Sequence, residues 1–113
     1  MSPCDKPLVW LRGLVSTPPF SSEARVEAGF LLRLLQQGVS LSMPHSRPMP
    51  EIGIHCHELR IRDRSHNWRI VYAVTDSAIV ILEVFEKKTE KIPRLVVETC
   101  RKRWNEYRIL SDE

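Results

Sequence analysis

Three strand-like segments follow one another between residues 57 and 86, and they constrain the fold more than any other feature of the chain. In "HELRIRD" (57–63), polar and apolar residues alternate, as they do along a strand with one buried face. "WRIVYAV" (68–74) also alternates, whereas "AIVILEVFE" (78–86) is apolar on both faces, as a central strand is. The connections "DRSHN" and "TDS" are short, which predicts an antiparallel meander.

The flanking segments predict one further strand and two helices. "PLVWLRG" (7–13) is rich in β-forming residues and must pair with the sheet, because its backbone would otherwise be left unsatisfied. A helix is expected from a cap at Ser21 or Ser22 to Gly38, and a second helix from Pro93. The apolar stripe of the second helix consists of Val97, Cys100, Trp104 and Tyr107.

We therefore predict an α+β fold with the order β-α-β-β-β-α, in which a small, antiparallel-rich sheet carries both helices on one face. At 113 residues the chain can bury one core, so we expect a single domain over 1–113. The recognisable core of this domain, which contains the predicted strands and helices, spans about 7–109. Residues 39–56 contain three prolines and a glycine, which predicts an extended connection.

Composition argues against several classes of protein. No apolar run approaches the roughly 20 residues that span a bilayer, and the N-terminus has no signal-peptide pattern. Cys4, Cys56 and Cys100 have no paired spacing, which favours reduced thiols in a cytoplasmic protein. The four histidines show no recognised ligand spacing, so we expect no bound metal. The lack of a membrane-spanning run predicts no membrane partner.

Positive charge is concentrated in one part of the chain. Residues 87–108 hold eight lysines and arginines against three glutamates, a balance of +5, whereas the whole chain carries +3. A local positive field of this kind is typical of a surface that binds a polyanion. A solvated helix face with excess lysine is the alternative interpretation.

Five cations are expected to converge near the strand ends. Arg60 and Arg62 lie on the polar side of one predicted strand, Arg69 on the polar side of its hairpin partner, and Lys87 and Lys88 after the third strand. Guanidinium groups bind phosphate through paired hydrogen bonds, and they also neutralise charge that develops on a reacting phosphate. The pattern predicts a phosphate site, with a chance arrangement of surface charge as the alternative.

Three motifs resemble the HigB-like, phage-derived branch of the RelE/ParE toxin superfamily. They are "ELR" (58–60), "WRI" (68–70) and "FEKKTEKIP" (85–93), and that branch typically has E-L-R, Y/W-R-I and F-x-K-K-T-x-K-T-P in this order. The resemblance covers roughly residues 57–107. Ile92 stands where the family has threonine, so the last helix lacks that side-chain cap.

The resemblance implies the toxin of a toxin–antitoxin pair, which cuts mRNA, usually on the ribosome, without metal or cofactor. Its partner would be a cognate helix-turn-helix antitoxin. By similarity, Arg60, Arg62 and Arg69 would hold the scissile phosphate and neutralise its transition state. Lys87 and Lys88 would bind the backbone or protonate the leaving oxygen, and the 2′-hydroxyl of the RNA would be the nucleophile.

Further residues are assigned to the same site. Glu83 is a candidate acceptor for the 2′-hydroxyl proton, or alternatively the ion-pair partner of an arginine. His57 or His66 near the arginines would contact RNA or transfer a proton, with ordinary loop and strand-edge positions as the alternative. The remaining expected RNA or phosphate contacts are Lys88, Lys91 and Arg94.

A non-catalytic module of the same fold is the competing hypothesis, because a fold alone does not establish an RNase. Such a module would bind nucleic acid, gyrase or only its antitoxin. Both hypotheses predict salt-sensitive binding to polyanions. Only the nuclease predicts that Arg60, Arg69 and Lys87 can each be replaced with loss of cleavage while folding survives.

Overall fold

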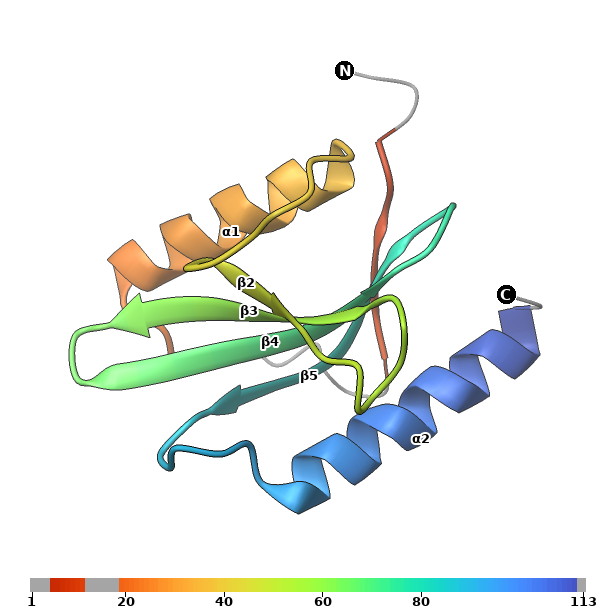
Figure 1. The fold of residues 1–113 in the computed structure, drawn as a ribbon. Helices are drawn as coiled ribbons and strands as arrows, with labels where there is room; N and C mark the ends of the chain where they lie inside the picture. Colours follow the sequence, from red (N-terminus) through yellow and green to blue (C-terminus); the bar gives the residue numbers. More distant parts are fainter. Residues whose placement is uncertain (1–4, 12–18, 112–113) are drawn as a thin grey trace.

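The computed structural model describes residues 5–11 and 19–111, which form a five-stranded sheet and two helices (Figure 1). In chain order the elements are β1 (Leu8–Trp10), α1 (Ser22–Gln36), β2 (Ser46–Pro48), β3 (Cys56–Asp63), β4 (His66–Val74), β5 (Ile79–Glu86) and α2 (Arg94–Ser111). The predicted α+β class is confirmed. Residues 12 and 13 of the first predicted strand lie outside the described residues.

The strand order in the sheet is β1-β5-β4-β3-β2. β3, β4 and β5 form the antiparallel meander that the sequence predicts. β1 pairs with β5 in parallel, so the first strand does join the sheet, and the sheet is mixed. The meander therefore forms the centre, with two short strands at its edges.

β2 was not predicted. It lies within the proline-rich connection and pairs antiparallel with β3, so the order of elements is β-α-β-β-β-β-α. Proline argues against a central strand because it has no N–H to donate, but at the end of a short edge strand that donor is not needed. Pro48 occupies such a position.

The prediction that both helices pack on one face is wrong, because α1 and α2 cover opposite faces of the sheet (Figure 1). Neighbouring residues of a strand point to opposite faces. β4 and β5 are apolar on both, so each face needs a cover. Under α1 lie Leu59, Ile61, Ile70, Tyr72, Ile79 and Ile81. On the other face, Cys100 and Trp104 of α2 pack in one cluster with four residues of the sheet, namely Val71, Ala73, Val80 and Leu82.

Both helices begin close to their predicted starts. The Ser21 side chain caps α1 by accepting a hydrogen bond from the Ala24 N–H at 3.1 Å, which satisfies a donor of the first turn. After α1 the chain leaves through Gly38, whose φ of 89° suits glycine. α2 begins at Arg94, one residue after Pro93, whose carbonyl accepts from the first turn.

The pairing of β4 with β5 contains an irregularity at one point. Val71 pairs with Glu83, whereas the next residue, Tyr72, pairs with Ile81. Leu82 is therefore an extra residue in β5, as in a β-bulge. After it, every side chain of β5 points to the face opposite the one that simple alternation predicts.

This bulge changes which residues of β5 share a face. Simple alternation would place Ile79, Ile81, Glu83 and Phe85 on one face, but the bulge separates them. The two isoleucines pack under α1, whereas Glu83 and Phe85 lie on the other face, with Phe85 directly opposite Arg69. The end of β5 is thereby aligned with the arginine-bearing face of β3 and β4.

Candidate phosphate-binding site

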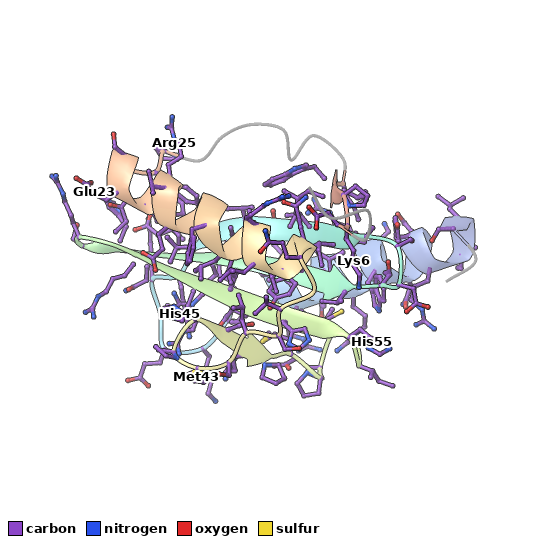
Figure 2. The ribbon with its side chains drawn as sticks, turned by 90° about the horizontal axis from the view of Figure 1, so that it is seen from above. Lys6, Glu23, Arg25, Met43, His45 and His55 are labelled. Carbon is purple, nitrogen blue, oxygen red and sulfur yellow. The ribbon has the colours of Figure 1, made fainter. Side chains whose placement is uncertain are left out.

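The three arginines that the sequence singles out line one groove of about 550 Å³, together with His45 and Asn67 among others. Arg60 and Arg69 are directly opposite each other in the β3–β4 ladder, and Arg62 is opposite Asn67. His45, labelled in Figure 2, lies in the loop just before β2. Its carbonyl accepts a 2.8 Å hydrogen bond from the Arg60 N–H. The predicted convergence of these arginines is therefore confirmed.

The arginines differ in how far they reach into solvent. Arg69 is only 7% exposed, and its Nη1 donates to the carbonyl of Trp68 at 3.1 Å. Burial lowers the pKa of the Arg69 guanidinium, and the neighbouring Glu58 carboxylate opposes this shift. Arg60 is half-buried and Arg62 is exposed. Arg69 thus forms the floor of the groove and the other two form its wall.

Glu58 lies among these cations and was not predicted as a site residue. It is 1% exposed, and its Oε1 lies 3.5 Å from Arg69 Nε and 3.8 Å from Arg47 Nε. Arg47 was also missed, because it comes from the unpredicted β2. The signal in the sequence was the "ELR" motif, in which alternation places Glu58 on the same strand face as Arg60.

Lys87 follows β5, and its amine interacts electrostatically with Glu58 and with the arginines around it. Partial burial lowers the pKa of its amine, Glu58 raises it, and the nearby arginines lower it further. Its N–H donates to the Asn67 carbonyl at 2.7 Å, which fixes the backbone there. We call the group around Glu58 the cationic cluster; its members are Arg47, Arg60, Arg69 and Lys87.

Glu83 pairs with an arginine, as one of the two predictions for it proposed. Its Oε2 lies 3.5 Å from Nη1 of Arg103 on α2. The same Arg103 nitrogen donates to the carbonyl of Leu82 at 2.6 Å. Arg103 is therefore a half-buried link between α2 and β5 and not a solvent-side residue of the helix.

The two histidines lie on the face opposite the cationic cluster, so the expectation that either is near the arginines is wrong. His57 stacks on Tyr72 with ring centroids 5.4 Å apart, on the face covered by α1. His66 lies 2.6 Å from Glu86 through Nδ1 and stacks near Trp68 on that same face. The physical reason is strand alternation, which separates odd from even positions.

Three further predicted contacts are exposed and lie beyond the groove, so the predicted convergence of five cations does not extend to Lys88. Lys88 and Lys91 are in the connection after β5, and Arg94 begins α2. Lys88 Nζ lies 4.0 Å from Glu86, and Arg94 Nε lies 3.1 Å from Glu98. They extend the positive surface from the strand end toward α2, and their contact with RNA stays a prediction.

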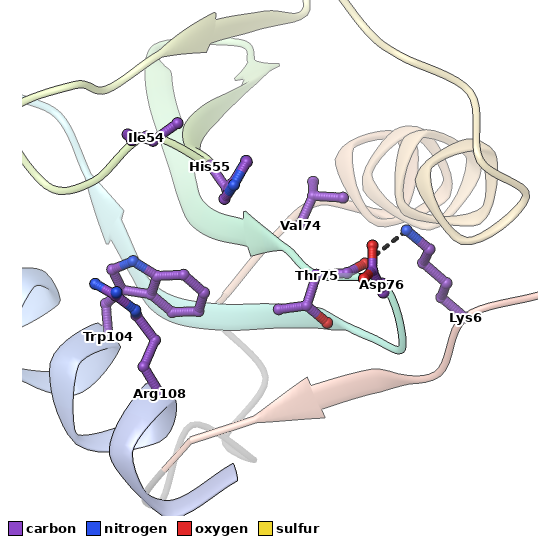
Figure 3. Close-up of a pocket in the computed structure, with 8 residues that line it drawn as sticks. All are labelled: Lys6, Ile54, His55, Val74, Thr75, Asp76, Trp104 and Arg108. Atoms are coloured by element: carbon purple, nitrogen blue, oxygen red, sulfur yellow. Dashed lines mark hydrogen bonds between the residues drawn. The ribbon is translucent and has the colours of Figure 1, made fainter. Parts of the chain in front are cut away.

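A second pocket, of about 420 Å³, lies at the other end of β4 (Figure 3). Its lining includes His55, Trp104 and Arg108, and Lys6 donates to the carbonyl of Thr75 at 2.6 Å. The Arg108 guanidinium lies 5.8 Å from the centroid of the Trp104 ring. Trp104 is 5% exposed, as expected of a residue on the apolar stripe predicted for the second helix.

Other predictions concern metal, thiols and membranes. Within residues 5–11 and 19–111, no three histidine, cysteine, aspartate or glutamate side chains are grouped as metal ligands would be.

Cys56 and Cys100 are free and buried, and burial raises the pKa of each thiol to about 12. Cys4 lies outside the described residues. None of the described helices is both long and apolar enough to cross a membrane.

Fold and site together define a small α+β protein with a basic groove on one face of its sheet. A family model described as "Phage derived protein Gp49-like (DUF891)" matches residues 19–105, and the chain belongs to this family. The family is toxin-like, of the RelE/HigB type. Neither the curated proteins nor the solved structures provide a significant match to the chain.

Proposed function

We propose that this protein is the toxin of a toxin–antitoxin pair and acts as a metal-independent mRNA endoribonuclease of the HigB type. The observation that carries the proposal is the convergence of Arg60, Arg62 and Arg69 on one groove, with Lys87 beside it. Membership of a toxin-like family supports the biological role. The remaining partners in this proposal are the ribosome, which presents the mRNA in the cytoplasm, and a helix-turn-helix antitoxin.

In the proposed reaction, the 2′-oxygen of the RNA attacks the adjacent phosphorus and the bond from phosphorus to the 5′-oxygen breaks. The products are a 2′,3′-cyclic phosphate and a free 5′-hydroxyl. Negative charge grows on the phosphate oxygens during attack, and fixed guanidinium groups stabilise it without reorganising. Arg60 and Arg69 supply these groups from opposite strands, and Arg62 holds the neighbouring backbone.

Two proton transfers accompany the attack. Lys87 gives a proton to the leaving 5′-oxygen, and its lowered pKa makes it a better donor near neutral pH than an ordinary lysine. Glu83 is the candidate acceptor of the 2′-hydroxyl proton, and in the free protein its carboxylate pairs with Arg103. Glu83 and Phe85 lie on the same face of β5, and Lys87 follows the end of this strand.

The proposal is tested by inducing the protein in growing cells and mapping mRNA ends in the same cultures. Arg60→Ala and Lys87→Ala are compared with the wild type, and Lys102→Ala is the matched control, because Lys102 is an exposed cation of α2 outside the groove. Growth arrest with new mRNA ends, lost in both site variants but kept in the control, is the expected result. Growth arrest without new mRNA ends would contradict the proposed RNase activity. If the folded protein causes no arrest, a non-catalytic module is favoured.

A further inference from the structure

A carboxylate is buried in the middle of the sheet where the surrounding side chains are cationic. Glu58 is 1% exposed and lies opposite Arg47 on β2 and opposite Val71 on β4. Burying a carboxylate is strongly unfavourable unless neighbouring charges and hydrogen bonds compensate. A residue at this position therefore needs a reason beyond filling space.

The compensation for Glu58 comes from charge more than from hydrogen bonds. Arg69 Nε and Arg47 Nε lie 3.5 Å and 3.8 Å from its Oε1, distances that are long for charge-assisted hydrogen bonds. Glu58 Oε2 and Arg69 Nε are buried and have no hydrogen-bond partner. The carboxylate is surrounded by cations but not saturated by them.

The cations around Glu58 repel one another strongly. Arg60 and Arg69 are directly opposite in the ladder, and like charges in that arrangement are destabilising. Arg47 and Lys87 add two more positive charges close by, and Glu58 is the carboxylate whose charge acts on Lys87. Without a central anion the four side chains would move apart into solvent.

The other glutamates near the end of the sheet have different partners. Glu83 pairs with Arg103 of α2, and Glu86 lies against His66 on the opposite face. Glu27 lines the groove from α1. Glu58, however, is the carboxylate whose charge acts on both Arg69 and Lys87, so it is placed to hold the cluster together.

We propose that Glu58 is a positioning residue of the phosphate site, an inference that rests on the proposed function. Its buried carboxylate fixes the Arg69 guanidinium on the floor of the groove and offsets the repulsion among the four cations. Arg60 and Arg69 are thereby presented together to one phosphate. Glu58 does not touch RNA, because the sheet and the cluster cover it.

The substitution Glu58→Gln separates positioning from simple electrostatics. Glutamine keeps the size of the side chain but removes a negative charge from a polyanion-binding surface, which by itself strengthens RNA binding. Loss of positioning instead lowers kcat, by roughly 10- to 100-fold, with KM unchanged or lower. Glu23→Gln, the same charge change at the exposed start of α1, is the control and is expected to cleave like the wild type.

A second measurement does not depend on cleavage. In the ¹⁵N spectrum of the wild type, the Arg69 Nε–H signal is expected to be as rigid as the backbone, whereas that of exposed Arg62 is averaged by motion. In Glu58→Gln, Arg69 becomes mobile and the pKa of Lys87 falls, because the anion that raises it is gone. Failure of the wild type to cleave would contradict the proposed function alone. An Arg69 as mobile as Arg62 in the wild type, or an unchanged kcat in folded Glu58→Gln, would overturn the role of Glu58.

Discussion

At the scale of single residues, Arg69 combines burial with charge, so its replacement is expected to affect the stability of the fold as well as the proposed site. Removing one partner of a buried ion pair leaves the other charge uncompensated. Arg69→Ala leaves the Glu58 carboxylate buried with one cation fewer, so we expect the free energy of unfolding to fall by about 3–5 kcal/mol. Urea denaturation measures this loss.

Arg62→Ala is the matched control for that prediction. Arg62 belongs to the same groove but is exposed, so its removal is expected to change the free energy of unfolding by less than about 0.5 kcal/mol. Equal losses for the two variants would contradict the central position that we assign to Arg69. The contrast also explains why Arg60 and Lys87 are better positions than Arg69 for a functional test in cells.

At the scale of secondary-structure elements, α1 contains a glycine that its packing does not require. A Cβ at Gly29 would meet nothing within 4 Å, and glycine in a helix costs about 1 kcal/mol relative to alanine. Gly29→Ala is therefore expected to raise the free energy of unfolding by about 0.5–1 kcal/mol. Thermal or urea denaturation measures the change.

Gly53 provides the opposite case. A Cβ there would lie 2.8 Å from Nε1 of Trp104, the residue that anchors α2 on the sheet. Gly53→Ala is expected to lower the free energy of unfolding by about 1–3 kcal/mol, because the indole must move in a packed core. If Gly29→Ala destabilises the protein, the packing described for α1 is wrong. If Gly53→Ala leaves the free energy of unfolding unchanged, the packing described for Trp104 of α2 is wrong.

The contact between α1 and the β3–β4 hairpin is expected to depend on pH, because it includes the carboxylate of Asp63. Asp63 Oδ2 accepts hydrogen bonds from the Ser21 N–H at 2.9 Å and from Trp68 Nε1 at 3.3 Å. The hydrogen bonds from Ser21, foremost among the causes, hold the pKa of Asp63 below its usual value of 3.8. The stabilisation is therefore present in full above that value and is lost as the pH falls through the lower pKa of the folded state.

Asp63→Asn tests this dependence. We expect the variant to be less stable than the wild type at pH 7, with the difference shrinking as the pH falls below 3.8. The free energy of unfolding, measured by urea titration between pH 2 and pH 7, decides it. A difference that grows toward acid pH would contradict the assignment.

How far these elements could be predicted depends on whether a local pattern encodes them. α1 and the three meander strands were predictable because periodicity, the Ser21 cap and short turns are local signals. β2 was not, since an edge strand with proline is stabilised only by its distant partner, β3. The bulge at Leu82 was also hidden, because it is defined by pairing between strands.

At the scale of the whole molecule, two layers of helix enclose a sheet and leave its arginine-bearing end open as a groove. Alternation along two strands joined by a short hairpin predicts that Arg60, Arg62 and Arg69 share one face, and the strand pairing confirms it. Glu58 was not predicted because one of the cations around it, Arg47, comes from β2, a strand that no local pattern encodes. For His57 and His66 the alternative of ordinary positions holds, because strand alternation places both on the face opposite the arginines.

The most direct test of the account is cleavage of one defined mRNA by purified protein, offered free and on ribosomes, with the product ends identified. Wild type and Lys102→Ala are expected to cut it and to leave a 2′,3′-cyclic phosphate, whereas folded Arg60→Ala and Lys87→Ala lose at least about 100-fold in rate. Replacing the 2′-hydroxyl at the cut site by hydrogen should abolish cleavage by the wild type. Cleavage by the site variants, or cleavage of the 2′-deoxy substrate, would contradict the proposed mechanism. The proposed RNase activity would be contradicted if the folded wild type cuts the mRNA neither free nor on ribosomes.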